Sequence, residues 1–402
     1  MKIAIVVHGR FHAFDLAREL INLGHDVTLF TNYPKYIVKK WGIPAKNVES
    51  FLIHGIVSKA ASWLNEKLKF PYPEPFLHKW FSTWARKGIL KKDYDVVRVF
   101  SGVAEEIFKA LVNKKALKIL TRGSAHILFQ HKLLLEEEER AGVFIDKPKR
   151  WGINRELREY ELADSIQVLS TFAQKSFLMH GIAKDRLSLL LSSTQVERFR
   201  PDKKVIDERC GRILSGKPLR ILMVGTFSFR KGILDFCKIV SLTGEAFRFR
   251  FVGRISKEAY GAARGYKDKI EFIPRKFEFE LPKFYNWADI FIFPTIEDSF
   301  PVVLAQAQAA GLPIASSANC CAPDIIEEGR SGWVLPIRSP GAFAERLAWC
   351  DAHRSALSKM ALSIYENFKP RGWPEVAKDF IDMTNEILNK HTRANGSQGR
   401  GL

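Results

Sequence analysis

Short runs of apolar residues alternate with longer segments of helical periodicity along most of the chain. In the first half these runs are bounded by polar residues or glycine, and they fall at 3–7, 26–30, 96–100, 116–120 and 166–169. The segment 13–23 is amphipathic and stops at Gly24. Because a short, continuous apolar run is typical of a strand buried on both faces, this alternation predicts a parallel sheet covered by helices.

A second series of the same kind begins after residue 218. Its apolar runs fall at 219–225, 248–252, 270–273, 290–293 and 313–315. Between 188 and 218 the pattern fades into a polar, basic interval that ends in Ser215-Gly216-Lys217-Pro218, a combination typical of a linker. The sequence therefore predicts an α/β protein of two Rossmann-like, doubly wound domains that face each other across a cleft, with ligands at the carboxyl ends of the strands.

These patterns also give domain boundaries. We expect an N-terminal domain at 1–195, a linker at 196–218 and a C-terminal domain at 219–370. A helix at 371–390 is expected to cross back to the N-terminal domain, and residues 391–402 to form a disordered tail. No apolar run approaches the roughly 18 residues of a spanning helix, and the first residues do not follow the pattern of a signal peptide.

Composition and charge bear on compartment and partners. The five cysteines are odd in number and lack Cys-x-x-Cys spacing, which favours a reduced, cytoplasmic chain over a disulfide framework or a zinc site. The net charge of +19 predicts a polyanionic partner: nucleic acid, an anionic membrane surface or a phosphate-bearing substrate. Nucleic acid is the least favoured of the three, because the chain contains no recognisable binding module for it.

Candidate chemistry in the second half begins where its first strand ends, in the segment 224–232. Gly225 allows the backbone to approach a ligand, while Arg230 and Lys231 stand at the entrance of the next helix, where free N–H groups already favour an anion. A diphosphate fits this arrangement, although a basic turn exposed to solvent would have the same sequence pattern. Neither the P-loop pattern nor Gly-x-Gly-x-x-Gly is present.

A second segment, 293–314, places polar groups at a strand end and on the following helix. Asp298 precedes this helix and Gln306 lies within it, two helical turns later, so both side chains can face one ligand. A carboxylate and an amide can bind sugar or ribose hydroxyls. The alternative is an N-capping acid and an ordinary polar helix face.

Together, the two segments resemble the retaining glycosyltransferases of family 4, whose GT-B architecture consists of two Rossmann-like domains. In the family pattern G-R-L-x-x-x-K-G this sequence has Gly225, Lys231 and Gly232 in register, with Thr226 where Arg is usual and Arg230 as its expected substitute. The resemblance implies that Arg230 and Lys231 hold the donor diphosphate. It covers 219–336 well and the first domain more loosely.

The family pattern P-S-x-x-E-G-F-G-x-x-x-x-E-A-M-A-x-G-x-P is similar to residues 294–313. It aligns Asp298 with the first Glu, which in the family approaches the donor sugar, and Gln306 with the second, which holds the donor ribose. Glu297 stands one position out of register, and we expect it to bind the donor together with Ser299 and Phe300. Backbone groups around 273–275 are expected to recognise the donor base.

The first domain supplies the other wall of the expected cleft. Polar residues follow its first strand, where the family places a loop near the donor phosphate or the acceptor: His8, Gly9, Arg10 and His12. A residue after the strand 116–120, commonly His, touches the donor hexose in the family. Arg122 and His126 are both candidates for this catalytic position.

Two further stretches have competing interpretations. Asp93-Tyr94-Asp95 looks like a metal-binding D-x-D motif, but it stands before a strand and family 4 enzymes generally need no bound metal, so we expect no metal site. The stretch 75–92 combines aromatic and basic residues at near-helical spacing. It is either a helix that lies on an anionic bilayer or a core helix with a charged outer face.

The resemblance implies a retaining, hexosyltransferase-type enzyme that moves a sugar from a nucleotide-diphospho-sugar to a hydroxyl of a glycan or lipid-linked acceptor, in surface polysaccharide or lipopolysaccharide synthesis. The N-terminal domain would face the acceptor and the C-terminal domain would bind the donor, with no cofactor, no metal and no nucleic acid. Thr226, Asp298 and Gln306 motivate an alternative, a catalytically weakened nucleotide-sugar-binding protein or assembly partner. The expected location is cytoplasmic, with peripheral attachment to the inner face of the membrane left open.

Overall fold

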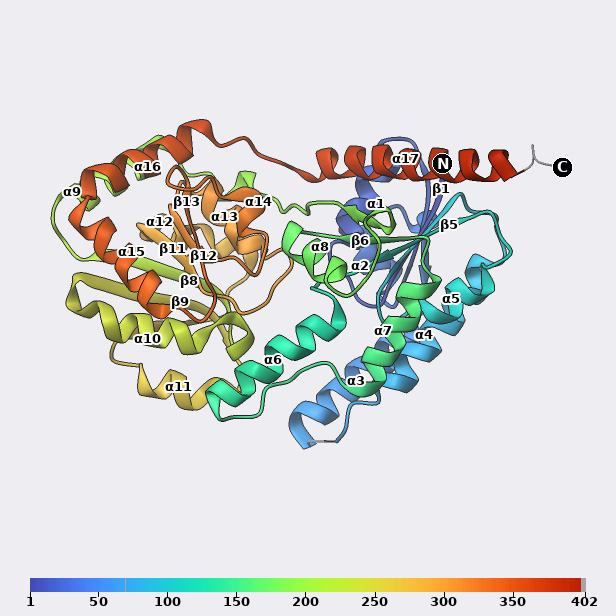
Figure 1. The fold of residues 1–402 in the computed structure, drawn as a ribbon, viewed down its shortest axis with the longest axis horizontal. Helices are drawn as coiled ribbons and strands as arrows, with labels where there is room; N and C mark the ends of the chain where they lie inside the picture. The colour runs from blue at the N-terminus through green and yellow to red at the C-terminus, as the bar shows by residue number, and fades with distance from the viewer. Residues whose placement is uncertain (69, 399–402) are drawn as a thin grey trace.

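The computed structural model describes residues 1–68 and 70–398, and it contains two parallel β-sheets, one in each half of the chain (Figure 1). The predicted two-domain α/β fold is thereby confirmed. Within those two ranges, no helix is both long enough and apolar enough to cross a membrane.

The N-terminal domain has a seven-stranded sheet in the order β3-β2-β1-β4-β5-β6-β7. Its strands are β1 (Lys2–Val7), β2 (Asp26–Thr31), β3 (Val48–Ser50), β4 (Val96–Phe100), β5 (Leu117–Thr121), β6 (Ser165–Val168) and β7 (Leu187–Leu189). Its helices are α1 (Ala13–Asn22), α2 (Lys35–Lys39), α3 (Leu52–Leu68), α4 (Glu74–Ile89), α5 (Glu105–Ala110), α6 (Ile127–Ala141), α7 (Arg150–Leu162) and α8 (Thr171–Leu178).

The C-terminal domain has a six-stranded sheet in the order β10-β9-β8-β11-β12-β13. Its strands are β8 (Leu219–Phe227), β9 (Phe247–Ile255), β10 (Ile270–Pro274), β11 (Ile290–Phe293), β12 (Ile314–Ser317) and β13 (Gly332–Leu335). Its helices are α9 (Lys203–Leu214), α10 (Ile233–Thr243), α11 (Tyr260–Gly265), α12 (Pro282–Trp287), α13 (Val302–Ala309), α14 (Ala322–Ile325), α15 (Pro340–Ala352) and α16 (Arg354–Asn367).

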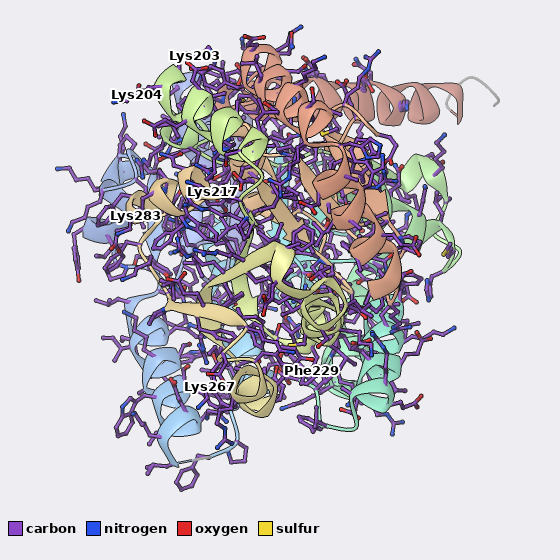
Figure 2. All side chains as sticks on the ribbon, turned by 90° about the vertical axis from the view of Figure 1, so that its left-hand side faces the viewer. Lys203, Lys204, Lys217, Phe229, Lys267 and Lys283 are labelled. Carbon is purple, nitrogen blue, oxygen red and sulfur yellow. The ribbon has the colours of Figure 1, made fainter. Side chains whose placement is uncertain are left out.

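Short 3₁₀ helices join these elements: η1 (Ala45–Asn47), η2 (Lys184–Arg186), η3 (Glu197–Phe199), η4 (Phe229–Lys231), η5 (Gly244–Ala246), η6 (Lys257–Ala259) and η7 (Glu278–Glu280). The lysines are spread over the C-terminal domain. Lys203 and Lys204 lie at one edge of the domain and Lys267 at the opposite edge, so these three form no single basic stripe (Figure 2).

The continuous apolar runs form strands because both of their faces are covered. In β1, Ala4 and Val6 pack into the core on one side of the sheet, whereas Ile3, Ile5 and Val7 pack into the core on the other side. Each sheet reverses its strand order once, at β1/β4 and at β8/β11. The loops after such a pair of strands leave in opposite directions and open a crevice at the carboxyl ends.

The expected linker at 196–218 contains helix α9 (Lys203–Leu214), so this part of the prediction is wrong. Ile206, Arg209 and Ile213 are buried, at the spacing of one helix face. The Arg209 guanidinium donates to four backbone carbonyls of the C-terminal domain, those of Tyr285, Ala288, Ala310 and Gly311. The basic composition concealed the helix, because an arginine fills a core position.

Helix α17 (Trp373–Gln398) leaves the C-terminal domain and packs against α1 (Figure 1). Trp373, Val376 and Phe380 are buried in the N-terminal core. Where the chain crosses back, the Ser193 hydroxyl donates to the Arg371 carbonyl. The helix continues through 391–398, where a disordered tail was expected. Residues 399–402 of that tail lie outside the described residues.

The aromatic, basic stretch 75–92 corresponds to α4 and is a core helix. Leu77, Phe81 and Ala85 are fully buried at intervals of four residues, where one face of a helix meets the sheet. Trp84 stacks on Phe51 with ring centroids 4.8 Å apart. The core alternative therefore describes this helix.

Candidate functional site

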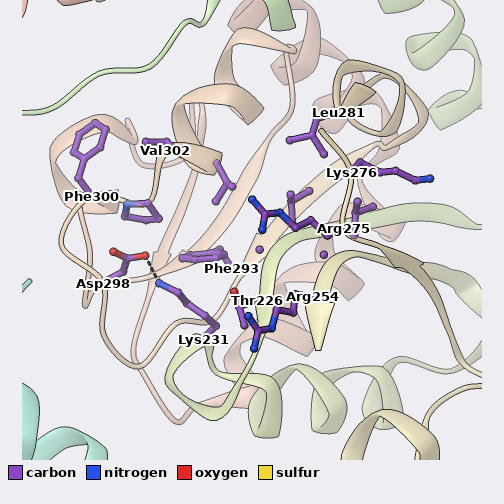
Figure 3. Close-up of a pocket in the computed structure, with 16 residues that line it drawn as sticks. Thr226, Lys231, Arg254, Arg275, Lys276, Leu281, Phe293, Asp298, Phe300 and Val302 are labelled. Carbon is purple, nitrogen blue, oxygen red and sulfur yellow. Dashed lines mark hydrogen bonds and ion pairs between the residues drawn. The ribbon is translucent and has the colours of Figure 1, made fainter. Parts of the chain in front are cut away.

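A pocket of about 500 Å³ opens at the carboxyl ends of β8, β9 and β11 (Figure 3). Gly225 and Thr226 of β8 line one side, and Phe300, which follows β11, lines another. The pocket therefore lies where the strand order of the C-terminal sheet reverses, at β8/β11, which is where doubly wound folds bind ligands.

Glycines allow the backbone segments around this pocket to come close together. Gly225 and Gly253 are partners on neighbouring strands, and a Cβ atom on Gly253 would lie 1.7 Å from the Gly225 carbonyl oxygen. Gly232 has a φ of 74°, and a Cβ atom there would lie 1.7 Å from the carbonyl oxygen of Pro294. Only glycine at 232 lets the loop after β8 pass against the loop after β11.

This close approach brings Lys231 and Asp298 together inside the pocket. The Lys231 ammonium forms an ion pair with the Asp298 carboxylate and lies 5.8 Å from the centre of the Phe293 ring (Figure 3). Both charged side chains keep some exposure to the pocket. The sequence analysis placed both residues at one ligand, and the structure puts both in the pocket wall.

Three more cations line the pocket: Arg254, Arg275 and Lys276. Within the described part of the chain, their side chains make no hydrogen bond or ion pair. The only carboxylate among the lining residues is Asp298, which already pairs with Lys231. The pocket is therefore electropositive and suits an anionic ligand.

Glu297, next to Asp298, lies outside the pocket wall and joins the two domains. One of its carboxylate oxygens accepts from the Ala125 N–H at 3.1 Å, and the other accepts from the Gln130 amide at 2.8 Å. Arg230 donates to that second oxygen at 2.8 Å and to the Ser124 hydroxyl at 3.2 Å. We call Ser124, Ala125, Gln130, Arg230 and Glu297 the interdomain clasp.

The clasp holds its carboxylate in the charged form. Burial raises the pKa of Glu297, but the Arg230 guanidinium and the hydrogen bonds from Ala125 and Gln130 outweigh burial and leave the pKa below its ordinary range. Arg122 supports the clasp from behind, since its guanidinium donates to Gln130 at 2.8 Å and lies 3.0 Å from the Glu156 carboxylate. Arg122 is thus occupied within the N-terminal domain and does not line the pocket.

His126 is buried at the start of α6. Its Nδ1 atom accepts from the Leu128 N–H, which caps the helix, and its ring stacks on His180 at 4.2 Å. Burial lowers the pKa of His126 to about 3, with help from His180 and Arg122, so the ring is neutral at pH 7. The structure places it away from the pocket wall.

Two of the expected donor-binding residues are also buried elsewhere. Gln306 on α13 accepts a hydrogen bond from the Tyr285 hydroxyl at 2.8 Å. The Ser299 hydroxyl lies 3.4 Å from that of Ser170 in the N-terminal domain. Neither residue lines the pocket, whereas Phe300 does.

The loop after β1 turns toward its own domain. The Gly9 N–H donates to the Asn32 side chain at 3.0 Å, and Arg10 stacks over Trp41 at 3.8 Å. His8 contacts two other histidine rings, those of His54 and His78, at 5.0 and 5.1 Å. No group of three or more His, Cys, Asp and Glu side chains within 1–68 and 70–398 is arranged to hold a metal ion.

His12, the last of the loop residues, lies between the sheet and α17. Its Nε2 atom is 3.4 Å from the Arg98 guanidinium, and its ring stacks on Trp373. Burial, together with the Arg98 charge, lowers the pKa of His12 to about 3, and burial beside His78 and His54 does the same for His8. Both rings are therefore neutral at pH 7.

Sequence reasoning missed the side chains of Arg254, Arg275 and Lys276. The signal was present, because Arg254 is the penultimate residue of β9, and Arg275 and Lys276 are the first two residues after β10. The expectation at 273–275 concerned backbone groups, and Arg254 was not singled out. The rule that ligands lie at the carboxyl ends of strands identifies all three.

Comparison with known proteins gives partial sequence matches. Residues 218–351, which include the pocket, match the family model for glycosyl transferases group 1. The chain is 29% identical over 182 residues to the putative colanic acid biosynthesis glycosyltransferase WcaL of Salmonella typhimurium, covering 41% of this chain and 42% of the relative. It is 32% identical over 141 residues to the amylovoran biosynthesis glycosyltransferase AmsK of Erwinia amylovora, covering 32% and 35%. Each match spans less than half of the relative.

Solved structures match nearly the whole chain. The structure of Anabaena Alr3699/HepE in complex with UDP has a TM-score of 0.64 at 12% identity, covering 98% of this chain and 100% of that one. Sucrose-phosphate synthase from Thermosynechococcus elongatus has a TM-score of 0.67 at 15% identity, covering 99% and 100%. At these identities the likeness shows the fold, which is the GT-B arrangement of two doubly wound domains.

Proposed function

We propose that the protein is a glycosyltransferase that moves a sugar from a nucleotide-diphospho-sugar to a hydroxyl of a glycan or lipid-linked acceptor, in the synthesis of a cell-surface polysaccharide. The observation that carries this proposal is the electropositive pocket, where Lys231 and Asp298 meet within the residues matched to the glycosyltransferase model. Relatives named for colanic acid and amylovoran biosynthesis support the polysaccharide, and the HepE complexes with UDP and UDP-glucose support the donor class.

In the proposed reaction the pocket stabilises the leaving nucleoside diphosphate. Lys231 and Arg254 neutralise negative charge as the bond between the sugar carbon and the diphosphate oxygen breaks, and this electrostatic contribution is usually the largest in such a step. Asp298, held in place by Lys231, accepts hydrogen bonds from donor-sugar hydroxyls. These cations supply the positive charge, so the proposal includes neither a metal nor a further cofactor.

We further propose that the anomeric configuration is retained, as the family resemblance implies. The acceptor oxygen bonds to the sugar carbon on the face that the diphosphate leaves, and its proton passes to an oxygen of the departing phosphate. No side chain of the protein takes the role of a nucleophile. The interdomain clasp, in which Glu297 accepts from Ala125 and Gln130 and Arg230 donates to Ser124, keeps the domains closed and excludes water, so that the acceptor hydroxyl receives the sugar.

A screen of UDP- and GDP-sugars for donor hydrolysis and transfer tests the proposal. Lys231→Ala should lower the turnover number by about 10²–10³-fold. The variant should remain folded, because the side chain faces the pocket and not a core. Lys231→Arg, which keeps the charge, should restore part of the activity. Undiminished turnover by Lys231→Ala would refute the assigned role.

A second candidate is a nucleotide-sugar-binding protein with weakened catalysis. The buried hydrogen bond between Tyr285 and Gln306 favours it, because this bond keeps the carboxamide away from the pocket. Calorimetry with nucleoside diphosphates separates the two candidates, since binding without any turnover supports the second. We propose a cytoplasmic location in either case, which the five free cysteines support.

A further inference from the structure

Helix α3 (Leu52–Leu68) turns its apolar side chains away from the protein. Its buried residues are His54 and Ser58, both polar. Its large apolar side chains are exposed, and six of them define what we call the outer face: Ile53, Ile56, Val57, Trp63, Leu64 and Leu68. At 3.6 residues per turn, these six positions fall within an arc of about 140° of the helix circumference, and His54 and Ser58 lie outside that arc. The usual arrangement of a surface helix is reversed.

Specific contacts fix this orientation. The Nε2 atom of His54 is 3.0 Å from the Leu77 carbonyl oxygen on α4, and the Ser58 hydroxyl is 3.3 Å from the Nδ1 atom of His54. Gly55 lies so close to the Asn32 carbonyl that a Cβ atom would be 2.2 Å from the oxygen. Because polar contacts and a close backbone approach hold the inner side, the helix cannot rotate to bury its apolar side without losing them.

The apolar surface continues beyond the helix. Phe70, which follows α3, and Phe76, in the first turn of α4, are 61% and 62% exposed, as strongly as Ile53 at 64% and Ile56 at 60%. Single exposed apolar residues are ordinary, but a contiguous group of this kind marks an interaction surface. Within the described residues, four of the six outer-face side chains are more than half exposed, those of Ile53, Ile56, Trp63 and Leu68.

The positive charge of this region indicates which partner binds the outer face. The segment 52–92 contains eight lysine and arginine residues and two glutamates, and the whole chain carries a net charge of +19. Lys59 and Lys67 are exposed on α3 itself. A second copy of the chain would bring like charges together, whereas an anionic bilayer offers apolar depth and opposite charge at once. Basic helices with an aromatic and aliphatic face lie at bilayer interfaces for this reason.

The position of α3 relates the surface to the pocket. The Lys257 ammonium donates to the carbonyl oxygen of Glu66 in the last turn of α3, at 3.3 Å. Lys257 follows the pocket residue Arg254 by three positions. In Figure 1, α3 lies along the lower edge of the molecule with α6 and α11. The exposed helix thus ends beside the rim of the pocket.

We propose that the outer face of α3, with Phe70 and Phe76, docks the protein on the surface of an anionic lipid bilayer. The helix lies in the headgroup region parallel to the membrane, and its polar side stays attached to the protein. Docking in this orientation brings the pocket rim close to the lipid surface, where a lipid-linked acceptor would be held. The docking itself is independent of sugar transfer, and its failure would leave the proposed enzyme activity intact.

Co-flotation of the full chain with vesicles tests the proposal. The protein should float with vesicles that contain phosphatidylglycerol and phosphatidylcholine, and at least tenfold less with phosphatidylcholine alone. The variant Ile53→Glu/Ile56→Glu should lower partitioning onto the anionic vesicles by about tenfold or more, because it puts two charges where apolar side chains enter the bilayer. Val112→Glu is the matched control, since Val112 is also 60% exposed but lies outside α3. It should float like the parent protein.

Fluorescence locates the contact. Trp63 is 57% exposed on the outer face, so its emission should shift to shorter wavelength when anionic vesicles are added. Trp63→Phe keeps the face apolar, and it should abolish this shift while the protein still floats. A circular dichroism melt verifies that each variant is folded.

Three results would overturn the proposal. The first is equal flotation of the folded Ile53→Glu/Ile56→Glu variant and the parent. The second is equal binding to neutral and anionic vesicles. The third is a dimer in sedimentation equilibrium that the double substitution converts to a monomer, which would assign the surface to a second copy of the chain.

Discussion

Substitution of Glu297 by glutamine tests the interdomain clasp, because it preserves the size of the side chain and removes its charge. The carboxylate is fully buried and accepts from Arg230, Gln130 and Ala125 at 2.8, 2.8 and 3.1 Å. An amide has one acceptor oxygen, and its NH₂ group would face a donor. At least one buried donor of the clasp therefore loses its partner.

The size of the effect follows from the hydrogen bonds that cross between the domains. The ion pair between Arg230 and Glu297 lies within the C-terminal domain and does not itself hold the domains together. The hydrogen bonds that Ala125 and Gln130 donate to the Glu297 carboxylate cross between the domains. Because a hydrogen bond to a charged group contributes about 1.5–3 kcal/mol, we expect the substitution to weaken the contact between domains by about 2 kcal/mol. This weakening corresponds to an increase of about 30-fold in the ratio of open to closed molecules.

Hydrogen exchange measures this ratio directly. The Ala125 amide should exchange about 30-fold faster in Glu297→Gln, because opening of the domains releases its hydrogen bond. Glu136→Gln is the matched control. It also removes a charge that pairs across the domains, with Arg338 at 2.7 Å, but these two side chains are 38% and 25% exposed, and we expect a change of about 0.2–1 kcal/mol. Equal exchange rates of the Ala125 amide in the two variants would refute the role of the clasp in holding the domains together.

Three further outcomes are expected. Lys231→Ala should lower kcat for sugar transfer by about 10²–10³-fold, and equal kcat values would exclude its role at the diphosphate. Gly232→Ala should lower the free energy of unfolding in urea by more than about 2 kcal/mol, because its Cβ would overlap a carbonyl oxygen, whereas Gly123→Ala, which has open space, should change it little. The pKa of His12 falls to about 3 in the folded chain, so the unfolded state binds more protons below its ordinary value of 6.5. Unfolding free energy should therefore decrease as the pH falls from 6.5 toward 3, and His12→Gln should flatten this dependence. If the unfolding free energy of His12→Gln depends on pH as steeply as that of the parent protein, the assignment of this dependence to His12 is refuted.

The sequence predicted the fold because a strand that is buried on both faces is seen in the sequence as a continuous run of apolar residues. In β1 all five residues after the exposed Lys2 are apolar and buried, and the same pattern recurs in β11, where all four residues are buried. Lys231 and Asp298 could also be placed, since each follows a strand whose carboxyl end meets the crevice. For these residues, position along the chain was enough to locate them in space.

Other residues depend on contacts that no local pattern records. Glu297 and Asp298 are neighbours with the same chemistry, yet one faces the other domain and the other faces the pocket. The role of Arg209 depends on four carbonyl groups that lie 76 to 102 positions away in the sequence. Helix α3 has an amphipathic pattern, which tells that one side is apolar but not which side meets the protein. Tertiary packing determines each of these outcomes.

The return of α17 to the N-terminal domain has a mechanical consequence. The chain passes between the domains twice, and the two passages touch, because Ser193 and Leu191 of one passage hydrogen-bond to Arg371 of the other. Two adjacent covalent connections permit rotation of one domain about the line on which both lie, but they resist sliding or twisting of one domain on the other. Opening should therefore be a hinge rotation about the two connections, and the interdomain clasp opposes it. A proteolytic cut in either connection would leave the domains joined by the other.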